Sequence, residues 1–318
     1  MSALVITRAP TRIDFGGGWT DVPPYSDEMG GFVCNVAITR YATVSVSREL
    51  GAAAQRETSD TDRAIADAAA RRFRMQHEAT ITVESDFPMS AGLGGSSAVG
   101  VATVAALAAV RGEMMMPTAI AELSREIEIT DLGIPGGRQD HYAAAYGGAL
   151  GLRFGKGRVD VRRIPLGAKL KAEIERRCIV VYTGKSRVSG DTIDAVLGAY
   201  RAREPGVLHA LQRMREIAEQ MADALIDSDL DALARLVDEQ WQYQRSLHSS
   251  IPTPLIDEII ARAHDAGALG AKALGASGGG CVLAIARSDR VDAVREVVGA
   301  LGALLPFSID QRGVERCQ

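Results

Sequence analysis

Glycines and hydroxyl side chains are concentrated between residues 88 and 97, in the run Pro-Met-Ser-Ala-Gly-Leu-Gly-Gly-Ser-Ser. The segment Ile81–Val83 before this run has the composition of a strand, and the apolar run Val99–Val110 after it is long enough for a buried helix. Glycines at a strand-to-helix turn let backbone N–H groups approach an anion, which the partial positive charge of the helix N-terminus also attracts. Serine hydroxyls can bind phosphate oxygens or a hard cation. We therefore interpret the run as a polyphosphate cradle.

Two common phosphate-binding patterns do not describe this run. A Walker A loop has a first glycine, four intervening residues and then Gly-Lys-Ser/Thr, and the only Gly-Lys-Ser, at 184–186, has Ile179 where that first glycine belongs. The dinucleotide fingerprint G-x-G-x-x-G is matched only in part, because Ser97 stands in the position of the third glycine. The remaining alternative is a glycine-rich turn that serves only to pack a helix.

A second glycine-rich segment, residues 16–18, lies between the carboxylates of Asp14 and Asp21. Because glycine loses more backbone freedom on folding than other residues, three in succession indicate close contact with a ligand. A carboxylate can accept hydrogen bonds from two sugar hydroxyls, and Trp19 or Tyr25 could stack on a pyranose ring. Both carboxylates could also be turn residues that local N–H groups satisfy.

A third candidate carboxylate, Asp140, follows a tight loop that contains Pro135 and two glycines. It stands where an alanine-rich helix begins, so it is either a helix cap or a catalytic group. A helix that starts at Pro117 precedes the loop and carries Glu126 and Glu128, although glutamates on helices are usually only solvated. His141 beside Asp140 is interpreted as packing or hydrogen-bonded support.

Hydrophobic periodicity predicts the elements that hold these segments in place. We expect strands at Leu4–Ile6 and Gly30–Ile38, with Tyr41–Val46 as the hairpin continuation of the second, and an edge strand at Phe307–Ile309. A helix is expected over Asp60–Phe73. Apolar residues at helical spacing predict further helices in the second half: Gly190–Arg203, Val207–Ser228, Leu230–His248, Leu255–Ala266 and Val291–Leu301.

Three stretches of the chain, taken together, resemble the GHMP kinase superfamily. Residues 88–98 resemble its second motif, Pro-x-x-x-Gly-Leu-Gly-Ser-Ser-Ala, with one extra glycine. Residues 9–13 match the first motif, Ala-Pro-x-Arg-hydrophobic, and residues 272–280 resemble the third, a lysine followed by a glycine-rich loop. The resemblance covers nearly the whole chain and implies an α+β fold in two domains, residues 1–165 and 166–318, with the active site in the cleft between them.

The resemblance also implies roles for individual residues in ATP-dependent phosphoryl transfer. Asp140 would act at the substrate hydroxyl with Arg12 near the transferred phosphate, and Ser97 with Glu128 would hold Mg²⁺, Glu126 being the alternative to Glu128. The nucleotide would contact Pro88, Ser90, Ala91, Gly92, Leu93, Gly94, Gly95, Ser96 and Ser97. The substrate would contact Gly17, Gly18, Thr20, Asp21, Tyr25, Gly136, Gly137, Arg187, Gly278 and Gly279. Lys185 and Arg187 could meet an acidic substituent of the substrate or form a basic surface turn.

Two segments narrow the substrate class that the resemblance implies. Residues 17–24 look like the fucokinase version of the first motif, whereas the chain length and residues 136–142 look more like D-glycero-D-manno-heptose 7-phosphate kinases. Both kinds of kinase act on the anomeric hydroxyl. We therefore expect a kinase that phosphorylates C1 of a sugar in nucleotide-sugar synthesis, with the heptose phosphate as the favoured substrate. A fucokinase-like or other hexose 1-kinase, and a non-catalytic sugar sensor on the same fold, are the alternatives. The loop Trp19–Asp21 disfavours mevalonate as substrate.

Composition sets the remaining limits. The chain has 318 residues, of which 47% are apolar and 24% charged, with a net charge of −4, so neither nucleic acid nor an anionic membrane is an expected partner. No apolar run is long enough to cross a bilayer, and residues 1–12 lack the apolar core of a signal peptide. Because the four cysteines are scattered, we do not expect them to form a zinc site, and we expect the protein to reside in the reducing cytoplasm. The sequence leaves the oligomeric state open, a homodimer included.

Overall fold

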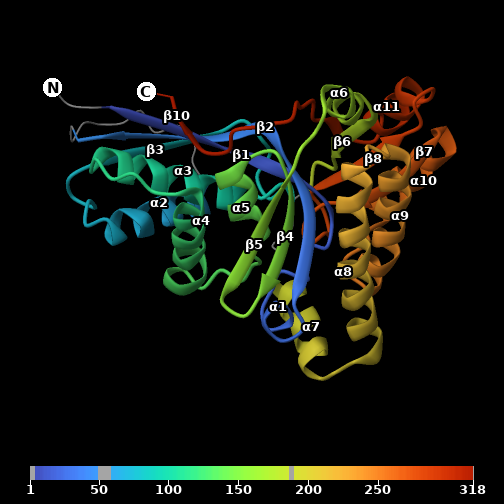
Figure 1. Cartoon of the computed structure of the whole chain (residues 1–318), viewed down its shortest axis with the longest axis horizontal. Coiled ribbons are helices and arrows are strands. Elements are labelled where there is room, and N and C mark those ends of the chain that lie inside the picture. Colours follow the sequence, from blue (N-terminus) through green and yellow to red (C-terminus); the bar gives the residue numbers. More distant parts are fainter. Residues whose placement is uncertain (1–3, 49–58, 186–189, 318) are drawn as a thin grey trace.

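A computed structural model describes residues 4–48, 59–185 and 190–317. Its larger sheet has six antiparallel strands in the order β10-β1-β2-β4-β5, with β3 pairing along another part of β2. The strands are β1 (Val5–Gly16), β2 (Gly31–Ser47), β3 (Thr80–Ser85), β4 (Ala149–Gly155), β5 (Arg158–Ile164) and β10 (Glu315–Arg316). Because β10 pairs with β1, the two ends of the described chain lie side by side (Figure 1).

Strand β2 is one continuous element, which corrects the predicted hairpin between Ile38 and Tyr41. Residues on both sides of that point pair with the same strand, since Ile13 faces Val36 and Pro10 faces Tyr41. The register shifts after Pro10, which has no N–H to donate to a sheet ladder. The chain therefore bends at an irregularity instead of turning back on itself.

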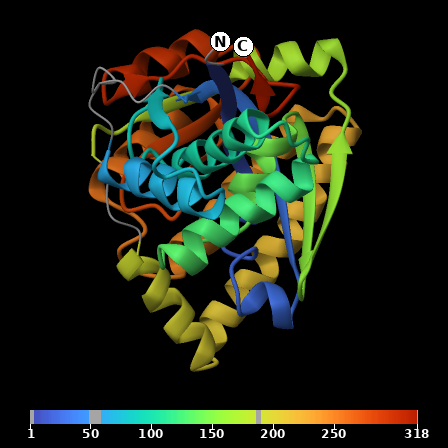
Figure 2. The ribbon, with the colours of Figure 1, turned by 90° about the vertical axis from the view of Figure 1, so that its left-hand side faces the viewer.

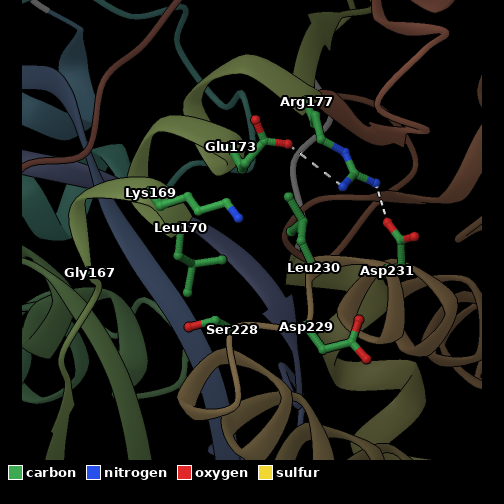
Figure 3. A pocket seen from close by; sticks show the side chains of 9 residues that line it. All are labelled: Gly167, Lys169, Leu170, Glu173, Arg177, Ser228, Asp229, Leu230 and Asp231. Carbon is green, nitrogen blue, oxygen red and sulfur yellow. Dashed lines mark hydrogen bonds and ion pairs between the residues drawn. The ribbon is translucent and has the colours of Figure 1, made fainter.

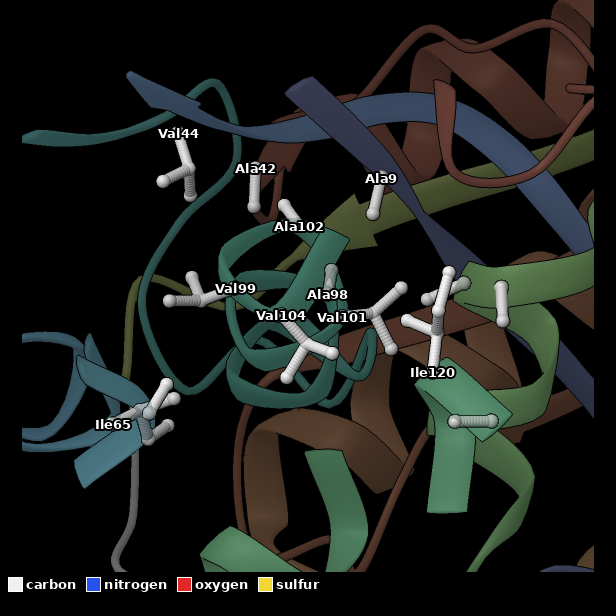
Figure 4. Close-up of a cluster of buried hydrophobic side chains, with 14 of the residues drawn as sticks. Ala9, Ala42, Val44, Ile65, Ala98, Val99, Val101, Ala102, Val104 and Ile120 are labelled. Carbon is white, nitrogen blue, oxygen red and sulfur yellow. The ribbon is translucent and has the colours of Figure 1, made fainter. Parts of the chain in front are cut away.

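One face of this sheet is covered by helices from the first half of the chain (Figures 1 and 2). They are α2 (Asp60–Arg72), α3 (Gly95–Val110), α4 (Pro117–Glu126), the π-helical turn η1 (Ile127–Asp131) and α5 (Gln139–Tyr146). Helix α3 lies against β1 and β2, and its small apolar residues fill the layer between sheet and outer helices, as Figure 4 shows for Val99, Val101 and Ala102. Burial all round explains why the sequence of α3 shows no polar stripe.

The other face of the sheet packs on the second half of the chain. Along β2 the side chains alternate, so Val33 enters the core beneath α3 while Phe32 and Cys34 enter a second core with α8 (Pro205–Ile226) and α9 (Leu230–Ser246). A smaller sheet adjoins this second core in the order β7-β8-β6-β9. Its strands are β6 (Cys178–Tyr182), β7 (Ala268–Ala273), β8 (Cys281–Ala286) and β9 (Ala303–Leu304).

The remaining helices surround the smaller sheet or connect the layers. They are α1 (Tyr25–Glu28), α6 (Ala168–Arg177), α7 (Gly190–Arg201), α10 (Pro254–Ala266) and α11 (Val291–Gly299). Helix α10 shows local signals at both ends: the Thr253 side chain caps its N-terminus, and Gly267 ends it in the left-handed conformation. No helix among the described residues combines the length and apolarity that crossing a bilayer requires.

Most of the predicted helices are confirmed within a few residues of their ends. Helix α3 begins at Gly95, four residues before the predicted start, so the last glycine and both serines of the cradle lie in its first turn. The predicted edge strand Phe307–Ile309 is wrong, because only Ile309 forms an isolated bridge, to Ile38. The domain boundary at residues 165/166 falls in the connection between β5 and α6 and stays a prediction.

Candidate active site

Three segments that contain the motifs meet in space, and they are numbered here in chain order: residues 9–18, 88–98 and 272–281. The backbone N–H of Arg12 donates to the carbonyl of Leu93 at 3.0 Å, which joins the first segment to the second. The N–H of Cys281 donates to the carbonyl of Ala91 at 2.8 Å, which joins the third segment to the second. The approach is close, since a Cβ atom on Gly92 would lie 2.5 Å from a backbone oxygen of the third segment. The three segments that carry the resemblance therefore lie together.

The N-terminus of α3 lies at this meeting point. Gly94 caps the helix with a φ of +75°, a conformation that favours glycine, and the N–H groups of residues 95–97 have no carbonyl partner within the helix. A Cβ atom on Gly94 would lie 3.0 Å from Cγ of Asp140. The helix terminus predicted to hold phosphate thus adjoins the carboxylate predicted to act on the acceptor hydroxyl.

The predicted nucleotide-contacting residues differ in exposure. Ser90 is exposed, Pro88, Gly92, Gly94, Gly95 and Ser96 are half-buried, and Ala91, Leu93 and Ser97 are buried. The side chains of Ala91 and Leu93 belong to the core that also contains residues of α8. These two residues can therefore offer a ligand only their backbone.

Asp140 lies in the first turn of α5 and is held there by Arg12. Nε and one terminal nitrogen of Arg12 each lie 2.7 Å from Oδ1 of Asp140, and the same guanidinium donates to the carbonyl of Gly92. The Arg12 side chain is 4% exposed and that of Asp140 is 25% exposed. Among the described residues, none donates to Oδ2 of Asp140. The pair is thus anchored through one carboxylate oxygen and keeps the other available for a substrate hydroxyl.

Asp21 is fixed by the chain segment that leads into Asp140. Its Oδ2 accepts hydrogen bonds from the backbone N–H groups of Arg138 at 2.8 Å and Gln139 at 3.0 Å. A glycine at position 137 allows the backbone to approach the Asp21 carboxylate this closely, because a Cβ atom there would lie 1.9 Å from the same oxygen. Burial, opposed in part by these bonds and assisted by the charge of Asp140, raises the pKa of Asp21 to about 6.

Glu128 lies in the π-helical turn η1, which widens the helix after α4 and buries this carboxylate. Its Oε2 lies 3.5 Å from Nε2 of His141, whereas its Oε1 is buried and has no partner among the described residues. Burial and the neighbouring charge of Asp140 raise the pKa of Glu128 to about 8. The Ser97 hydroxyl lies 3.3 Å from the same imidazole nitrogen.

An orphaned carboxylate oxygen beside a serine hydroxyl suits a hard cation. Mg²⁺ takes oxygen ligands and keeps several waters and substrate phosphates, so two protein oxygens, from Glu128 and Ser97, suffice. The alternative ligand Glu126 does not fit this site, because its side chain is 51% exposed and pairs with Arg72 at 3.0 Å. The exposed face of α4 carries Glu126, whereas η1 turns Glu128 inward.

His141 supports this cluster. Its Nδ1 lies 3.1 Å from the hydroxyl of Ser124 on α4, and its Nε2 faces Ser97. Burial, followed by the charge of Arg125, lowers the pKa of His141 to about 3, so the ring is neutral near pH 7. A neutral, fully buried imidazole between two serines matches the interpretation of His141 as support.

Two predicted substrate residues in the first loop have structural roles instead. The Thr20 hydroxyl bonds the backbone of Gly17 and Phe32 and is fully buried, so it shapes the loop. Tyr25 is 2% exposed, and its ring packs edge-on against Tyr200 with centroids 5.5 Å apart. Core packing, which depends on a helix far along the chain, thus occupies the aromatic face that the sequence suggested for a sugar.

The predicted substrate glycines fall into three groups. Gly17 and Gly18 are required by packing, since Cβ atoms there would lie 2.0 Å from the carbonyl of Phe32 and 2.5 Å from Oδ2 of Asp14. Gly137 wraps Asp21, and Gly136 has open space around its Cβ position. Gly278 and Gly279 are half-buried in the β7–β8 loop. Arg187 lies outside the described residues, although the preceding Lys185 accepts a backbone bond from Gly280.

Sequence reasoning missed several residues that hold the site together. Lys272 donates to the backbone and side chain of Asp14, and Gln244 donates to the carbonyl of Gly275 and the hydroxyl of Ser277. These contacts join residues that are far apart in the sequence. The only local signal was the position of Lys272 at the start of the third motif.

Two hollows on the surface lie away from the three loops. The first, of about 460 Å³, is lined by residues of α6 and of the α8–α9 junction (Figure 3). Its most buried charged group, Arg177, already pairs with Asp231 and donates to the carbonyl of Ala286. The second, of about 500 Å³, lies between the ends of α10 and α11. Neither hollow contains a residue of the site described above.

Comparisons with known proteins identify both halves of the chain. The family described as "GHMP kinases N terminal domain" matches residues 61–148, and "GHMP kinases C terminal" matches residues 221–304. A D-glycero-alpha-D-manno-heptose 7-phosphate kinase from Campylobacter jejuni is 26% identical over 97% of both chains. A mevalonate kinase from Thermococcus onnurineus is 30% identical, over 74% of this chain and 68% of the relative.

A solved structure supports the fold over the full length. A D-glycero-D-manno-heptose 1-phosphate kinase from Bacteroides thetaiotaomicron superposes with a TM-score of 0.78 at 24% identity, covering 99% of both chains. At this identity the likeness establishes the shared architecture and leaves the substrate to the chemistry of the site.

Proposed function

This chain belongs to the GHMP kinase family and is an ATP-dependent kinase, and we propose that it phosphorylates the anomeric hydroxyl of a sugar. In this proposal the favoured substrate is D-glycero-D-manno-heptose 7-phosphate. One observation carries the proposal: the N–H groups that bind Asp21 belong to Arg138 and Gln139, directly before Asp140. Asp21, which is suited to bind sugar hydroxyls, is therefore held at a fixed separation from Asp140, which is suited to act in the transfer step.

In this proposal Asp140 orients the acceptor hydroxyl and accepts its proton through Oδ2, while Arg12 holds the carboxylate through Oδ1. The transferred phosphoryl group passes between the acceptor and the N-terminus of α3. Phosphoryl transfer needs positioning and charge neutralisation more than covalent help from the protein. The guanidinium of Arg12 and the free N–H groups of residues 95–97 supply positive potential at that place.

Glu128 and Ser97 are the residues that would hold Mg²⁺, because they offer a buried unpartnered carboxylate oxygen and a hydroxyl beside it. When bound, the ion would neutralise negative charge on the nucleotide phosphates. His141 keeps the Ser97 hydroxyl in place through its Nε2. Asp21 accepts hydrogen bonds from the sugar and so fixes which hydroxyl faces Asp140.

A coupled assay of ADP release tests the proposal. The panel contains D-glycero-D-manno-heptose 7-phosphate, the same heptose without phosphate, fucose, mannose and mevalonate, the last because of the 30% identical mevalonate kinase. We expect the highest kcat/KM for the heptose phosphate, with the product phosphorylated at C1 as read by ³¹P NMR. Turnover of mevalonate alone, or binding of a sugar without any turnover, would contradict the proposal.

A further inference from the structure

Two arginines beside the site form no ion pair with any residue that the structure describes. Arg138, which precedes Asp140 by two residues, is 8% exposed, and its Nε is buried without a hydrogen-bond partner among the described residues. Arg125, in the last turn of α4, is half-buried, and its Nε is likewise buried and unpartnered. Within the described part of the chain, neither guanidinium has an ion pair or a ring partner, which is unusual for buried charged groups.

The two guanidinium groups face the same region. Helices α4 and α5 pack together, and Arg138 adjoins Asp21 through the hydrogen bond from its backbone N–H. Burial, and next the charge of Arg138, lowers the pKa of Arg125, and the charges of Glu122, Asp27 and Asp21 oppose this shift only in part.

The acidic groups nearby compensate the charge of Arg125 only in part. Glu122 accepts the hydroxyl of Tyr142 at 2.5 Å, and Asp21 is bound by backbone N–H groups. Asp27 on α1 and Asp21 also act on Arg125, and Oδ1 of Asp27 is buried without a partner, yet among the described residues neither guanidinium forms an ion pair within 4 Å. Two guanidinium groups with buried Nε atoms, which no carboxylate of the described residues contacts directly, keep hydrogen-bond donors for a ligand that carries negative charge.

We infer that Arg125 and Arg138 form a second anion site, which binds the phosphate that the sugar substrate already carries. This inference rests on the proposed function, because it places the sugar at Asp21 and its distal phosphate on the α4–α5 side of that carboxylate. Guanidinium groups bind phosphate oxygens through paired, charge-assisted hydrogen bonds, and a dianionic phosphate matches two cations. The pair would thus select a phosphorylated sugar over the free sugar.

The test compares kcat/KM for D-glycero-D-manno-heptose 7-phosphate with kcat/KM for the same heptose without phosphate. In Arg125→Gln the ratio of the two values should fall roughly 10- to 100-fold, the range expected when hydrogen bonds to a charged group are lost. KM for ATP should stay within about threefold, and Arg125→Lys should recover part of the ratio. Arg235→Gln, which removes an exposed arginine of α9, is the matched control and should keep the wild-type ratio.

The outcomes separate this inference from the proposed function. If the wild-type protein turns over no sugar, the proposed function fails. If it turns over sugars but does not prefer the phosphorylated heptose, or if Arg125→Gln leaves the ratio unchanged, only the second anion site is refuted. A rise in KM for ATP in place of KM for the sugar phosphate would assign the arginines to the nucleotide and would also overturn the inference. Circular dichroism of each variant checks that its fold is retained.

Discussion

The ammonium group of Lys272 lies 3.1 Å from the carboxylate of Asp14, and both side chains are almost completely buried. Lys272 comes from β7 of the smaller sheet and Asp14 from β1 of the larger one. Lys272 also donates to the backbone carbonyl of Asp14 at 3.0 Å. This ion pair joins the two sheets next to the first glycine-rich loop.

We expect Lys272→Met to destabilise the protein by about 3–5 kcal/mol, because it leaves the Asp14 carboxylate buried without a counter-charge. Urea denaturation measures the loss of unfolding free energy. The double variant Asp14→Asn/Lys272→Met should recover much of it, since no uncompensated charge remains. A double variant as unstable as the single one would mean that lost packing, and not charge, causes the effect.

Gly92→Ala should weaken nucleotide binding. The residue has a φ of +74°, and its new Cβ would lie 2.5 Å from the carbonyl oxygen of Leu274, so the third loop must move away. Gly112→Ala is the matched control, with a φ of +72° and nothing within 4 Å of the Cβ position. The control should cost about 1–2 kcal/mol of stability. Gly92→Ala should cost more and raise the Kd for ATP in calorimetry, and equal effects of the two variants would contradict the contact.

Asp140→Asn should lower kcat by about 10²- to 10⁴-fold, since the amide cannot accept the substrate proton in the way a carboxylate does. The Kd for ATP should change by less than about threefold, because Asp140 faces the acceptor side of the α3 terminus. Asp131→Asn is the control: its side chain is also 25% exposed and also lies 2.7 Å from an arginine, Arg72. Near-normal turnover of Asp140→Asn would remove this residue from the mechanism.

The pKa of Asp21, raised to about 6 by burial, predicts a pH effect on sugar recognition. Above this pH the carboxylate is ionised and accepts hydrogen bonds from the sugar, and below it protonation removes acceptor capacity. The kcat/KM for the sugar should therefore fall as the pH drops below about 6, by up to tenfold per unit. Asp21→Asn should lower the plateau and abolish this decline. A decline that persists unchanged in the variant would assign it to the substrate or the nucleotide, which titrate in both proteins.

The glycine-rich motifs were the part of the candidate site that the sequence could predict, because phosphate binding requires local backbone geometry that short patterns record. Gly94 and Ser97 could be named for this reason, whereas the role of Asp140 came only from the family resemblance and stays a prediction. The position of Tyr25 could not, since its burial depends on Tyr200, which lies far along the chain. The sequence also left Glu126 and Glu128 open, because only the π-helical turn decides which of the two points inward.

Contacts between residues that are distant in the sequence also explain why the predicted hairpin at Ile38 and Tyr41 was wrong. The alternation around Ile38 and Tyr41 fits a hairpin and a continuous strand equally well, and the pairing with β1 decides between them. Arg125 and Arg138 gave no signal, because only three-dimensional neighbours decide whether a carboxylate contacts a guanidinium group.

The pairing of β1 with β10 has a consequence for biosynthesis. Strand β1 leaves the ribosome before the other described elements, whereas β10 follows all residues of the smaller sheet. The backbone edge of β1 that accepts β10 therefore waits unpaired during translation, and such an edge can pair with another chain. Removal of residues 315–317 should consequently lower the yield of soluble protein during expression more than it lowers the activity of molecules that have already folded.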